Sequence, residues 1–434
     1  MTDNIKNRII GEGKHLFLKM KTCLYWVALS AAAGLIVGVY SSLFAYILKL
    51  ATKAFAAYGW LLYLLPFAGL FIVFLYRAAG TFNDRGTNLV IGSINSDMQV
   101  PGKMAVLIFI STIITHLTGG SAGREGAALQ MGGSFGNVIA RVLKRNERDT
   151  KVLIMCGMSA AFAAVFGTPM AAVVFSMEVI SVGIMHYSAL VPCVFASIIA
   201  SRFAAGIGID PEAFILSGAP ALSAAGGVKV FILGALCAAV SAVFVVMLHK
   251  SGDIYRKCFK NPYVRVFAGG VLVILLTHLT GTRDYNGAGI GLIERAIFEG
   301  ETDSFAFLLK MLFTAVTLGA GFKGGEIVPS FCVGAVFGCL FGHIAGFSPS
   351  FCAALGMAAV FCGVTNCPLT TLLVSFELFG FAGIPYFMIV ISVSYMLSGY
   401  RGLYSDQIIV YSKYRPQFIN RHVGDESGDD LDGC

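Results

Sequence analysis

Residues 157–180 read GMSAAFAAVFGTPMAAVVFSMEVI, and the stretch reappears in altered form at 356–379 as GMAAVFCGVTNCPLTTLLVSFELF. Aligned without a gap, the two stretches share identical residues that include Gly157, Met158, Ala160, Phe162, Pro169, Ser176 and Glu178, which stand opposite Gly356, Met357, Ala359, Phe361, Pro368, Ser375 and Glu377. A second pair, GTFNDRGTNL (80–89) and GTRDYNGAGI (281–290), lies upstream at nearly the same spacing. Helices rich in glycine and alanine can resemble one another by composition alone, but two ordered matches predict that the chain consists of two related halves.

The composition indicates a membrane protein. The chain has 434 residues, of which 57% are hydrophobic and 13% charged, and its mean hydropathy is +0.79, whereas soluble domains carry about 25% charged residues. Apolar runs at 24–48, 60–76, 228–248 and 264–280 are near or above the ~17–25 residues that span a bilayer as a helix. We therefore predict an all-α polytopic membrane protein. Duplicated halves are typical of transporters, whose ion site lies near the midplane where the halves meet, although composition leaves open whether the halves are parallel or inverted.

The chain divides into four segments. Residues 1–21 are basic and predict a cytoplasmic N-terminus, because positive residues beside a span favour the cytoplasmic side. The first apolar run lacks the cleavage site of a secretory signal, so it predicts a retained helix. We place the first membrane repeat at 22–210 and the second at 225–412, and we expect the polar residues 413–434 to form a mobile tail.

The remaining charges and the cysteines suggest no cofactor. The formal net charge of +7 lies mostly in short loops, where it orients spans, so no nucleic-acid partner is expected. Most of the 11 cysteines lie inside apolar runs, as small buried hydrophobes do. The histidines are scattered without ligand spacing, and we therefore expect no metal site.

Several apolar segments are too short, or too broken by glycine and proline, to cross a bilayer. They are TNLVIGSINSDM (87–98), EGAALQMGGSFGNVIA (125–140), EIVPSFCVGAVFGCLFG (326–342) and PLTTLLVSFELF (368–379). Broken helices at membrane depth are tolerated where protein or a water-filled cavity covers the backbone. Their N-terminal amides and the positive end of the helix dipole form a natural anion site.

Glu125 lies at the start of one such segment, within GGSAGREGA (119–127), between Gly123 and Gly126. Glycines let backbone amides approach a ligand closely. Apolar surroundings favour a neutral carboxyl group whereas helix amides favour the ionised one, so the Glu125 side chain can either occupy the anion site or yield it on protonation. The alternative is a simple helix cap paired with Arg124, but ionisable residues inside a membrane are functional by default.

Four motifs together resemble the CLC family of anion channels and proton-coupled anion antiporters, over about residues 20–412: GREGA (123–127), the preceding GGSAG, GTPMAAVVFSMEV (167–179) and GLYSD (402–406). The resemblance implies a CLC-type fold of two inverted repeats with many tilted and partial helices. It also implies a homodimer in which each subunit has its own pore. Glu125 then matches the gating glutamate of the family, with Ala127 in place of the usual proline. Tyr404 matches the inner-gate tyrosine that faces the central anion, with an interfacial tyrosine as the alternative.

Two departures from the chloride-selective pattern resemble the fluoride-exporting branch of the family. Chloride-selective relatives carry GSGIP, whereas this chain has GTNLV (86–90), in which Thr87 takes the serine position and Asn88 follows it. The usual GxFxP is replaced by GGEIVP (324–329), which adds a second carboxylate, Glu326. Glu326 either handles protons or only interacts with the helix dipole.

Three further positions refine the resemblance. Chloride antiporters of the family often have an internal glutamate directly after the position of Glu178, where this chain has Val179, so protons would travel by Glu125 and possibly by Glu326. Glu178 and Glu377 recur at equivalent places in the two halves, which predicts a role in helix capping or loop anchoring. The resemblance to the fluoride branch implies a GNNLI-like motif with phenylalanines just after it, but this chain has Val90 and Ser93 in that region.

We predict a fluoride/proton antiporter that exports fluoride from the cytoplasm, with Glu125 as gate and proton carrier. Fluoride is small and strongly hydrated, so its site needs compact hydrogen-bond donors. The predicted anion-binding residues are Thr87, Asn88, Gly123, Gly126, Ile327, Val328 and Tyr404. Thr87 could also donate to chloride, so the alternative is a chloride/proton antiporter or a passive chloride channel.

No enzyme is expected, because the sequence shows no nucleophile and base in a recognisable arrangement. The predicted partners are fluoride, with chloride as the alternative, protons, the lipid bilayer and a second copy of the chain, and no nucleic acid. The predicted location is the plasma membrane, as a multi-pass protein, of a bacterium.

Overall fold

The computed structural model describes residues 2–81, 85–96, 98, 100–216 and 218–424. The predicted all-α fold class is confirmed, with one small sheet added. The helices of the first half are α1 (Thr2–Ala57), α2 (Leu65–Ala78), α3 (Thr87–Asn95), α4 (Lys103–Leu117), α5 (Glu125–Val142), α6 (Glu147–Phe166), α7 (Pro169–Glu178) and α8 (Leu190–Gly206). Those of the second half are α9 (Ala224–Cys258), α10 (Pro262–Thr280), α11 (Ile290–Glu294), α12 (Ala306–Ala320), α13 (Ile327–Ala345), α14 (Pro349–Thr365), α15 (Pro368–Phe379) and α16 (Ile384–Leu397).

Short turns and strands complete the order of elements. The short helical segments are the 3-10 helices η1 (Gly59–Leu64) and η2 (Tyr187–Ala189) and the π-helix η3 (Arg295–Glu299). The strands are β1 (Ser181–Val182), β2 (Ile408–Tyr411) and β3 (Phe418–His422). Strand β2 pairs in parallel with β1 and antiparallel with β3. The sheet therefore joins the end of α7 in the first half to the segment that follows α16.

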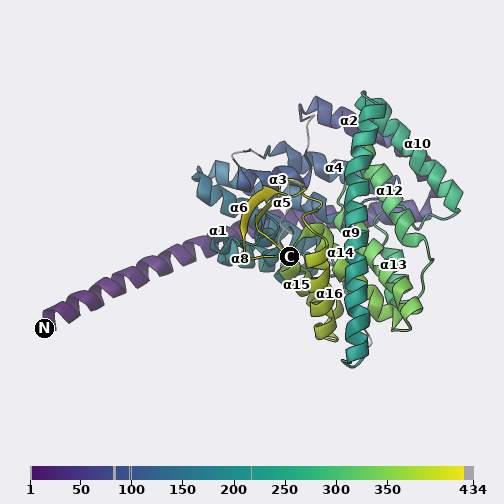
Figure 1. The fold of residues 1–434 in the computed structure, drawn as a ribbon. Coiled ribbons are helices and arrows are strands. Elements are labelled where there is room, and N and C mark those ends of the chain that lie inside the picture. The colour runs from purple at the N-terminus through teal and green to yellow at the C-terminus, as the bar shows by residue number, and fades with distance from the viewer. Residues whose placement is uncertain (1, 82–84, 97, 99, 217, 425–434) are drawn as a thin grey trace.

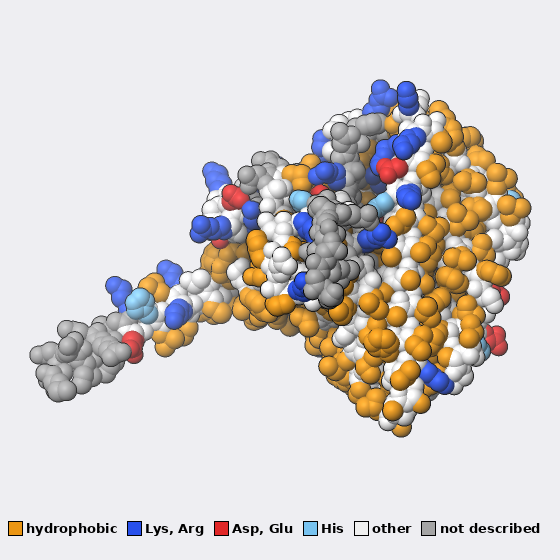
Figure 2. Space-filling model, viewed as in Figure 1, with side chains coloured by type: hydrophobic (Ala, Val, Ile, Leu, Met, Phe, Trp, Pro, Cys, Tyr) orange, Lys and Arg blue, Asp and Glu red, His pale blue; other side chains and the backbone are white. Residues whose placement is uncertain are grey.

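The described part of the chain contains seven helices that are long and apolar enough to cross a membrane. On α9 and α10 much of the surface is exposed and apolar, including Val228, Phe231, Val264 and Leu275, and Figure 2 shows hydrophobic side chains covering this flank of the molecule. Apolar side chains exposed over such an area are suited to contact lipid. Helix α1 begins far from the other helices, and its N-terminal part extends away from them (Figure 1).

Other helices are short, as the sequence predicts. Helix α3 has 9 residues, α7 has 10 and α15 has 12. At 1.5 Å per residue each is well below the ~30 Å of a hydrocarbon core. All three start or end inside the protein, among the buried residues of the main hydrophobic core. Their ends are thus available to form a site in the interior.

Equivalent glycines bring equivalent helix pairs together in the two halves. A side chain at Gly132 of α5 would collide with the backbone of Gly157 of α6, and one at Gly334 of α13 would collide with that of Gly356 of α14. Small residues allow membrane helices to pack backbone against backbone. The same close packing in both pairs is structural evidence for the predicted duplication.

The two halves are inverted, as a reciprocal pair of glutamates shows. Glu178, at the end of α7, accepts hydrogen bonds from the backbone N–H groups of Leu369 (3.1 Å) and Thr370 (2.8 Å) at the start of α15. Glu377, near the end of α15, accepts from those of Met170 and Ala171 (both 2.9 Å) at the start of α7. Each helix therefore runs antiparallel to its equivalent, and the predicted capping role of both glutamates is confirmed.

The ends of the predicted segments are placed as follows. Helices α8 and α9 lie on either side of the loop 207–223, where we divide the repeats 22–210 and 225–412. Of the basic segment 1–21, residues 2–21 form the beginning of α1, and residue 1 lies outside the described residues. The segment 413–434, for which we expect a mobile tail, includes strand β3, and residues 425–434 lie outside the described residues. The sequence did not predict strand β3, because the strand forms by pairing with β2 across the turn.

Candidate functional site

The site begins where the two halves touch backbone to backbone. The N–H of Gly123 donates to the carbonyl of Gly325 at 2.6 Å, and the N–H of Gly325 donates to that of Gly123 at 2.7 Å. This isolated antiparallel bridge joins the loop before α5 to the loop before α13. The motifs GREGA and GGEIVP therefore lie side by side, although about two hundred residues separate them. The bridge also uses the N–H of Gly123, a residue that we predicted to bind the anion.

Glu125 is the first residue of α5 and is fully buried. Its Oε2 accepts from the N–H of Arg124 at 3.1 Å, and the Nε of Arg124 donates to its Oε1 at 3.2 Å. A side-chain carbon on Gly123 would lie 3.1 Å from the same Oε2, so the glycine makes room for the carboxylate. The carboxylate thus lies at the N-terminus of a helix, where a negative charge is favoured.

Gly126 marks the place where the other polar groups converge. A side-chain carbon there would lie 3.3 Å from the Oγ1 of Thr87 and 3.3 Å from the Oε2 of Glu326. The Thr87 hydroxyl donates to the carbonyl of Gly126 at 3.3 Å and accepts from the Nε2 of Gln130 at 3.4 Å. The fold therefore assembles one hydroxyl, one amide and one carboxyl group around a position without a side chain. Gln130 is a member that sequence reasoning missed.

Three polar atoms of the site are buried without a partner among the described residues, namely the Oε2 of Glu326, the Oε1 of Gln130 and the hydroxyl of Tyr404. Buried polar atoms in proteins are nearly always hydrogen-bonded, so each exception indicates a possible ligand or functional role. Tyr404 is 2% exposed and lies within electrostatic reach of both Glu326 and Glu125. Ile327 and Val328 form the first turn of α13, where backbone N–H groups lack acceptors within the helix.

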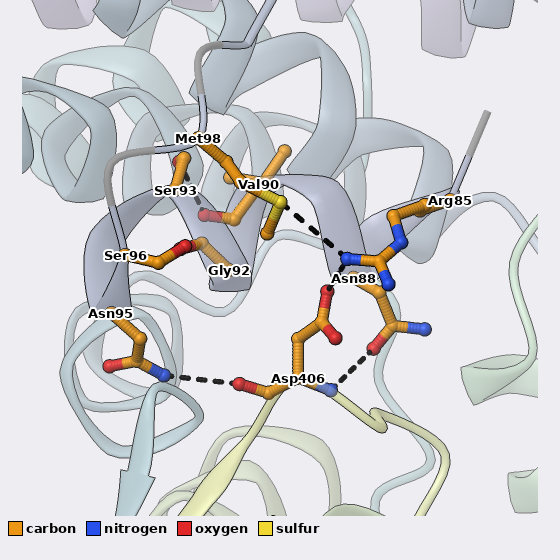
Figure 3. A network of polar contacts seen from close by, with 9 residues as sticks. All are labelled: Arg85, Asn88, Val90, Gly92, Ser93, Asn95, Ser96, Met98 and Asp406. Atoms are coloured by element: carbon orange, nitrogen blue, oxygen red, sulfur yellow. Dashed lines mark hydrogen bonds and ion pairs between the residues drawn. The ribbon is translucent and has the colours of Figure 1, made fainter. Parts of the chain in front are cut away.

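Asn88 lines the smaller of two cavities described below and also holds the loop that carries Tyr404. Its Oδ1 accepts from the N–H of Asp406 at 3.3 Å (Figure 3). Asp406 also pairs with Arg85 at 3.3 Å, and its carbonyl accepts from the Nδ2 of Asn95 at 3.1 Å. These contacts fasten α3 to the loop that carries Tyr404. This contact uses only the acceptor oxygen of Asn88 and leaves its Nδ2 group as a donor for an anion.

Two cavities approach the site, and helix α10 shows how they are arranged. Pro262 and Arg265, at one end of α10, line a cavity of about 350 Å³, whereas Thr277 and His278, at the other end, line a cavity of about 1030 Å³. Helix α10 has 19 residues and is a candidate membrane span, so it is about 28 Å long. The cavities therefore lie at opposite ends of a helix long enough to cross a membrane.

The smaller cavity reaches the carboxylate of Glu326, whereas the larger cavity reaches only the ion-pair partner of Glu125. The larger cavity is lined by Arg124, the partner of Glu125. The smaller one is lined by Glu326 and Asn88 and by four basic side chains, which are His249, Arg256, Arg265 and Lys323. Cations around a narrow cavity raise the local concentration of anions. This arrangement can admit an anion and hold two carboxyl groups beside the bridge between the two halves.

Comparisons with known proteins agree with this geometry. The family profile described as "Voltage gated chloride channel" matches residues 68–399. A chloride/fluoride channel protein of Pseudomonas syringae pv. tomato is 34% identical over 90% of this chain and 87% of its own length. An H(+)/Cl(-) exchange transporter of Vibrio cholerae is 28% identical over 59% of this chain and 58% of its own length.

A solved structure, that of a CLC-type fluoride/proton antiporter, matches with a TM-score of 0.85 and 31% identity, over 88% of this chain and 98% of that one. The profile match overlaps both predicted repeats, and every predicted site residue except Tyr404 lies within it. The chain therefore belongs to the voltage gated chloride channel (CLC) family of membrane transport proteins.

Proposed function

We propose that this protein is a fluoride/proton antiporter, and not an enzyme, that exports fluoride from the cytoplasm across the plasma membrane of a bacterium. The observation that carries the proposal is the convergence of Glu326 and Thr87 at Gly126, beside the bridge that holds Glu125. The likeness to a chloride/fluoride channel protein and to a fluoride/proton antiporter supports the choice of fluoride.

The coupling follows from charge. Two unit charges about 4 Å apart interact by about 4 kcal/mol at an effective dielectric constant of 20, which corresponds to roughly a thousandfold in occupancy. An anion and an ionised Glu125 therefore exclude each other, whereas a protonated Glu125 yields the site. Protonation and anion binding alternate on the same group, which links the two fluxes.

The donors around Gly126 suit a small anion. In the described structure the Thr87 hydroxyl donates to a carbonyl, and it can rotate toward an ion. The hydroxyl of Tyr404 has no other partner among the described residues, and the amides of Gly126, Ile327 and Val328 lie in first helical turns. Glu326, when protonated, adds an O–H donor of the short and strong kind.

The orientation completes the proposal. With the basic N-terminus in the cytoplasm, α1 ends on the outer side at Ala57, close to the larger cavity, which includes Lys49 and Lys53. Glu125 then exchanges protons with the outside, and Glu326 lies at the inner, basic cavity. An inward proton gradient drives fluoride outward. We further propose a homodimer in which each subunit transports independently.

A chloride/proton antiporter or a passive chloride channel is the alternative, since the Vibrio cholerae relative exchanges chloride.

The test uses purified protein in liposomes. An outward fluoride gradient should drive proton uptake, the same chloride gradient should drive much less, and Glu125→Gln should abolish uptake while fluoride still passes. The control Glu294→Gln changes an exposed carboxylate outside the site and should leave coupling intact. Faster chloride than fluoride flux, or coupling that survives in Glu125→Gln, would refute the proposal.

A further inference from the structure

Arg124 is shared by two carboxylates. Its Nε donates to Glu125, which is fully buried, and its Nη2 pairs with Oε1 of Glu212. The side chains of Arg124 and Glu212 are 18% and 17% exposed. Glu125 begins α5, whereas Glu212 belongs to the loop 207–223 between the two halves. One guanidinium group thus links the proposed gate to a segment that no sequence motif marks.

The loop holds Glu212 in a defined place. The N–H of Glu212 donates to the carbonyl of Phe166 at 3.4 Å, and that of Phe214 donates to the carbonyl of Leu378 at 2.7 Å. Gly167 ends α6 in the left-handed conformation (φ +79°), and a side chain there would collide with Pro211. The loop is therefore packed against the ends of α6 and α15, and Glu212 lies at a fixed distance from Arg124.

We propose that Glu212 is a positioning residue that competes with Glu125 for Arg124 and thereby sets the pH range in which the gate opens. The inference rests on the proposed gating role of Glu125. A buried ion pair is costly to break when one charge is left without a partner. When Glu125 takes up a proton it loses its attraction for Arg124, but Glu212 keeps the guanidinium group neutralised. Protonation of the gate therefore leaves no unpaired cation behind.

Other charged and titratable groups line the same cavity, and His116 among them lies within electrostatic range of Arg124. Arg283 donates to the carbonyls of Phe55 and Ala56, Asp284 pairs with Arg295, and the Nδ1 of His116 contacts the carbonyl of Thr112. His278 contacts the hydroxyl of Tyr63. Lys49, Lys53 and Asp210 also line the cavity. Asp210 is exposed and belongs to the same loop as Glu212, so it provides a matched control.

The experiment measures fluoride-driven proton uptake in liposomes as a function of pH for four proteins: wild type, Glu212→Gln, Glu212→Asp and Asp210→Asn. Without Glu212, Arg124 is left to Glu125 alone and stabilises its ionised form. The pH of half-maximal uptake should fall by about one unit, roughly tenfold in proton concentration, as expected for the loss of a neighbouring charge. Glu212→Asp keeps the charge on a shorter side chain and should shift the midpoint less. Asp210→Asn should not shift it.

The outcomes distinguish this inference from the proposed function. If Glu125→Gln abolishes coupling but Glu212→Gln and Glu212→Asp both keep the wild-type midpoint, the role of Glu212 is refuted and the proposed function stands. A lower rate at every pH without a shift of the midpoint also refutes it, because it indicates a purely structural role. If Glu212→Gln does not fold, the shift in Glu212→Asp decides. If coupling survives in Glu125→Gln, the proposed function itself fails.

Discussion

Replacing Gly126 by alanine should reduce fluoride transport strongly but lower the stability of the fold only slightly. Gly126 lies near the start of α5 with an ordinary helical backbone, so alanine is conformationally acceptable there and is a better helix former than glycine by up to about 1 kcal/mol. The added carbon would lie 3.0 Å from the Cα of Gly325, which must shift by a few tenths of an ångström. Overpacking of this kind costs about 1–3 kcal/mol. The two effects partly cancel, and we expect the free energy of unfolding to fall by no more than about 2 kcal/mol.

Transport should suffer far more. The same carbon would lie 3.3 Å from both the Thr87 hydroxyl and the Glu326 carboxylate, and it therefore takes the space between them. If an anion passes there, loss of one or two polar contacts, at about 1–3 kcal/mol each, should lower fluoride flux by about tenfold to a hundredfold.

The assay compares fluoride efflux from liposomes with thermal unfolding of the same preparations. Gly227→Ala is the matched control, because a side chain at Gly227, in α9, meets no atom within 4 Å. It should leave both flux and stability close to wild type. A Gly126→Ala protein that is folded and transports fluoride at the wild-type rate would show that the ion does not pass between Thr87 and Glu326.

Three further predictions concern other parts of the molecule. Glu377→Gln should lower the free energy of unfolding by about 1–3 kcal/mol, because it weakens two charge-assisted hydrogen bonds to the start of α7. The control Asp253→Asn changes an exposed carboxylate and should leave the stability unchanged. Equal stability of the two variants would count against the reciprocal caps. Asn88→Ala should weaken fluoride binding several-fold, since it leaves the N–H of Asp406 without its acceptor; an unchanged KM for fluoride would exclude this coupling between α3 and the Tyr404 loop. Arg265→Gln removes a cation from the smaller cavity and should slow fluoride entry at low ionic strength. The difference in flux from the wild type should vanish at high salt, because salt screens the charge. An effect independent of salt would indicate that Arg265 does not attract anions.

Much of this protein was determined by local sequence. The apolar runs and the low charge identify a membrane protein, because lipid admits few other compositions. The recurrence of Glu178 at Glu377 identifies the duplication and predicts the capping role that the hydrogen bonds confirm. Glu125 and Glu326 were recognisable as candidates because each carboxylate stands beside glycines at the start of a broken helix.

Only the tertiary structure decided how these local elements meet. The bridge between Gly123 and Gly325, the use of the Asn88 oxygen by Asp406 and the sharing of Arg124 by Glu125 and Glu212 join residues far apart in the chain. Such contacts depend on the packing of whole helices, and a sequence pattern with a helical period fixes which face is apolar but not which distant helix covers it. The sequence by itself therefore identifies the chemical groups of the site, whereas the fold decides which of them face an ion and which hold the others in place.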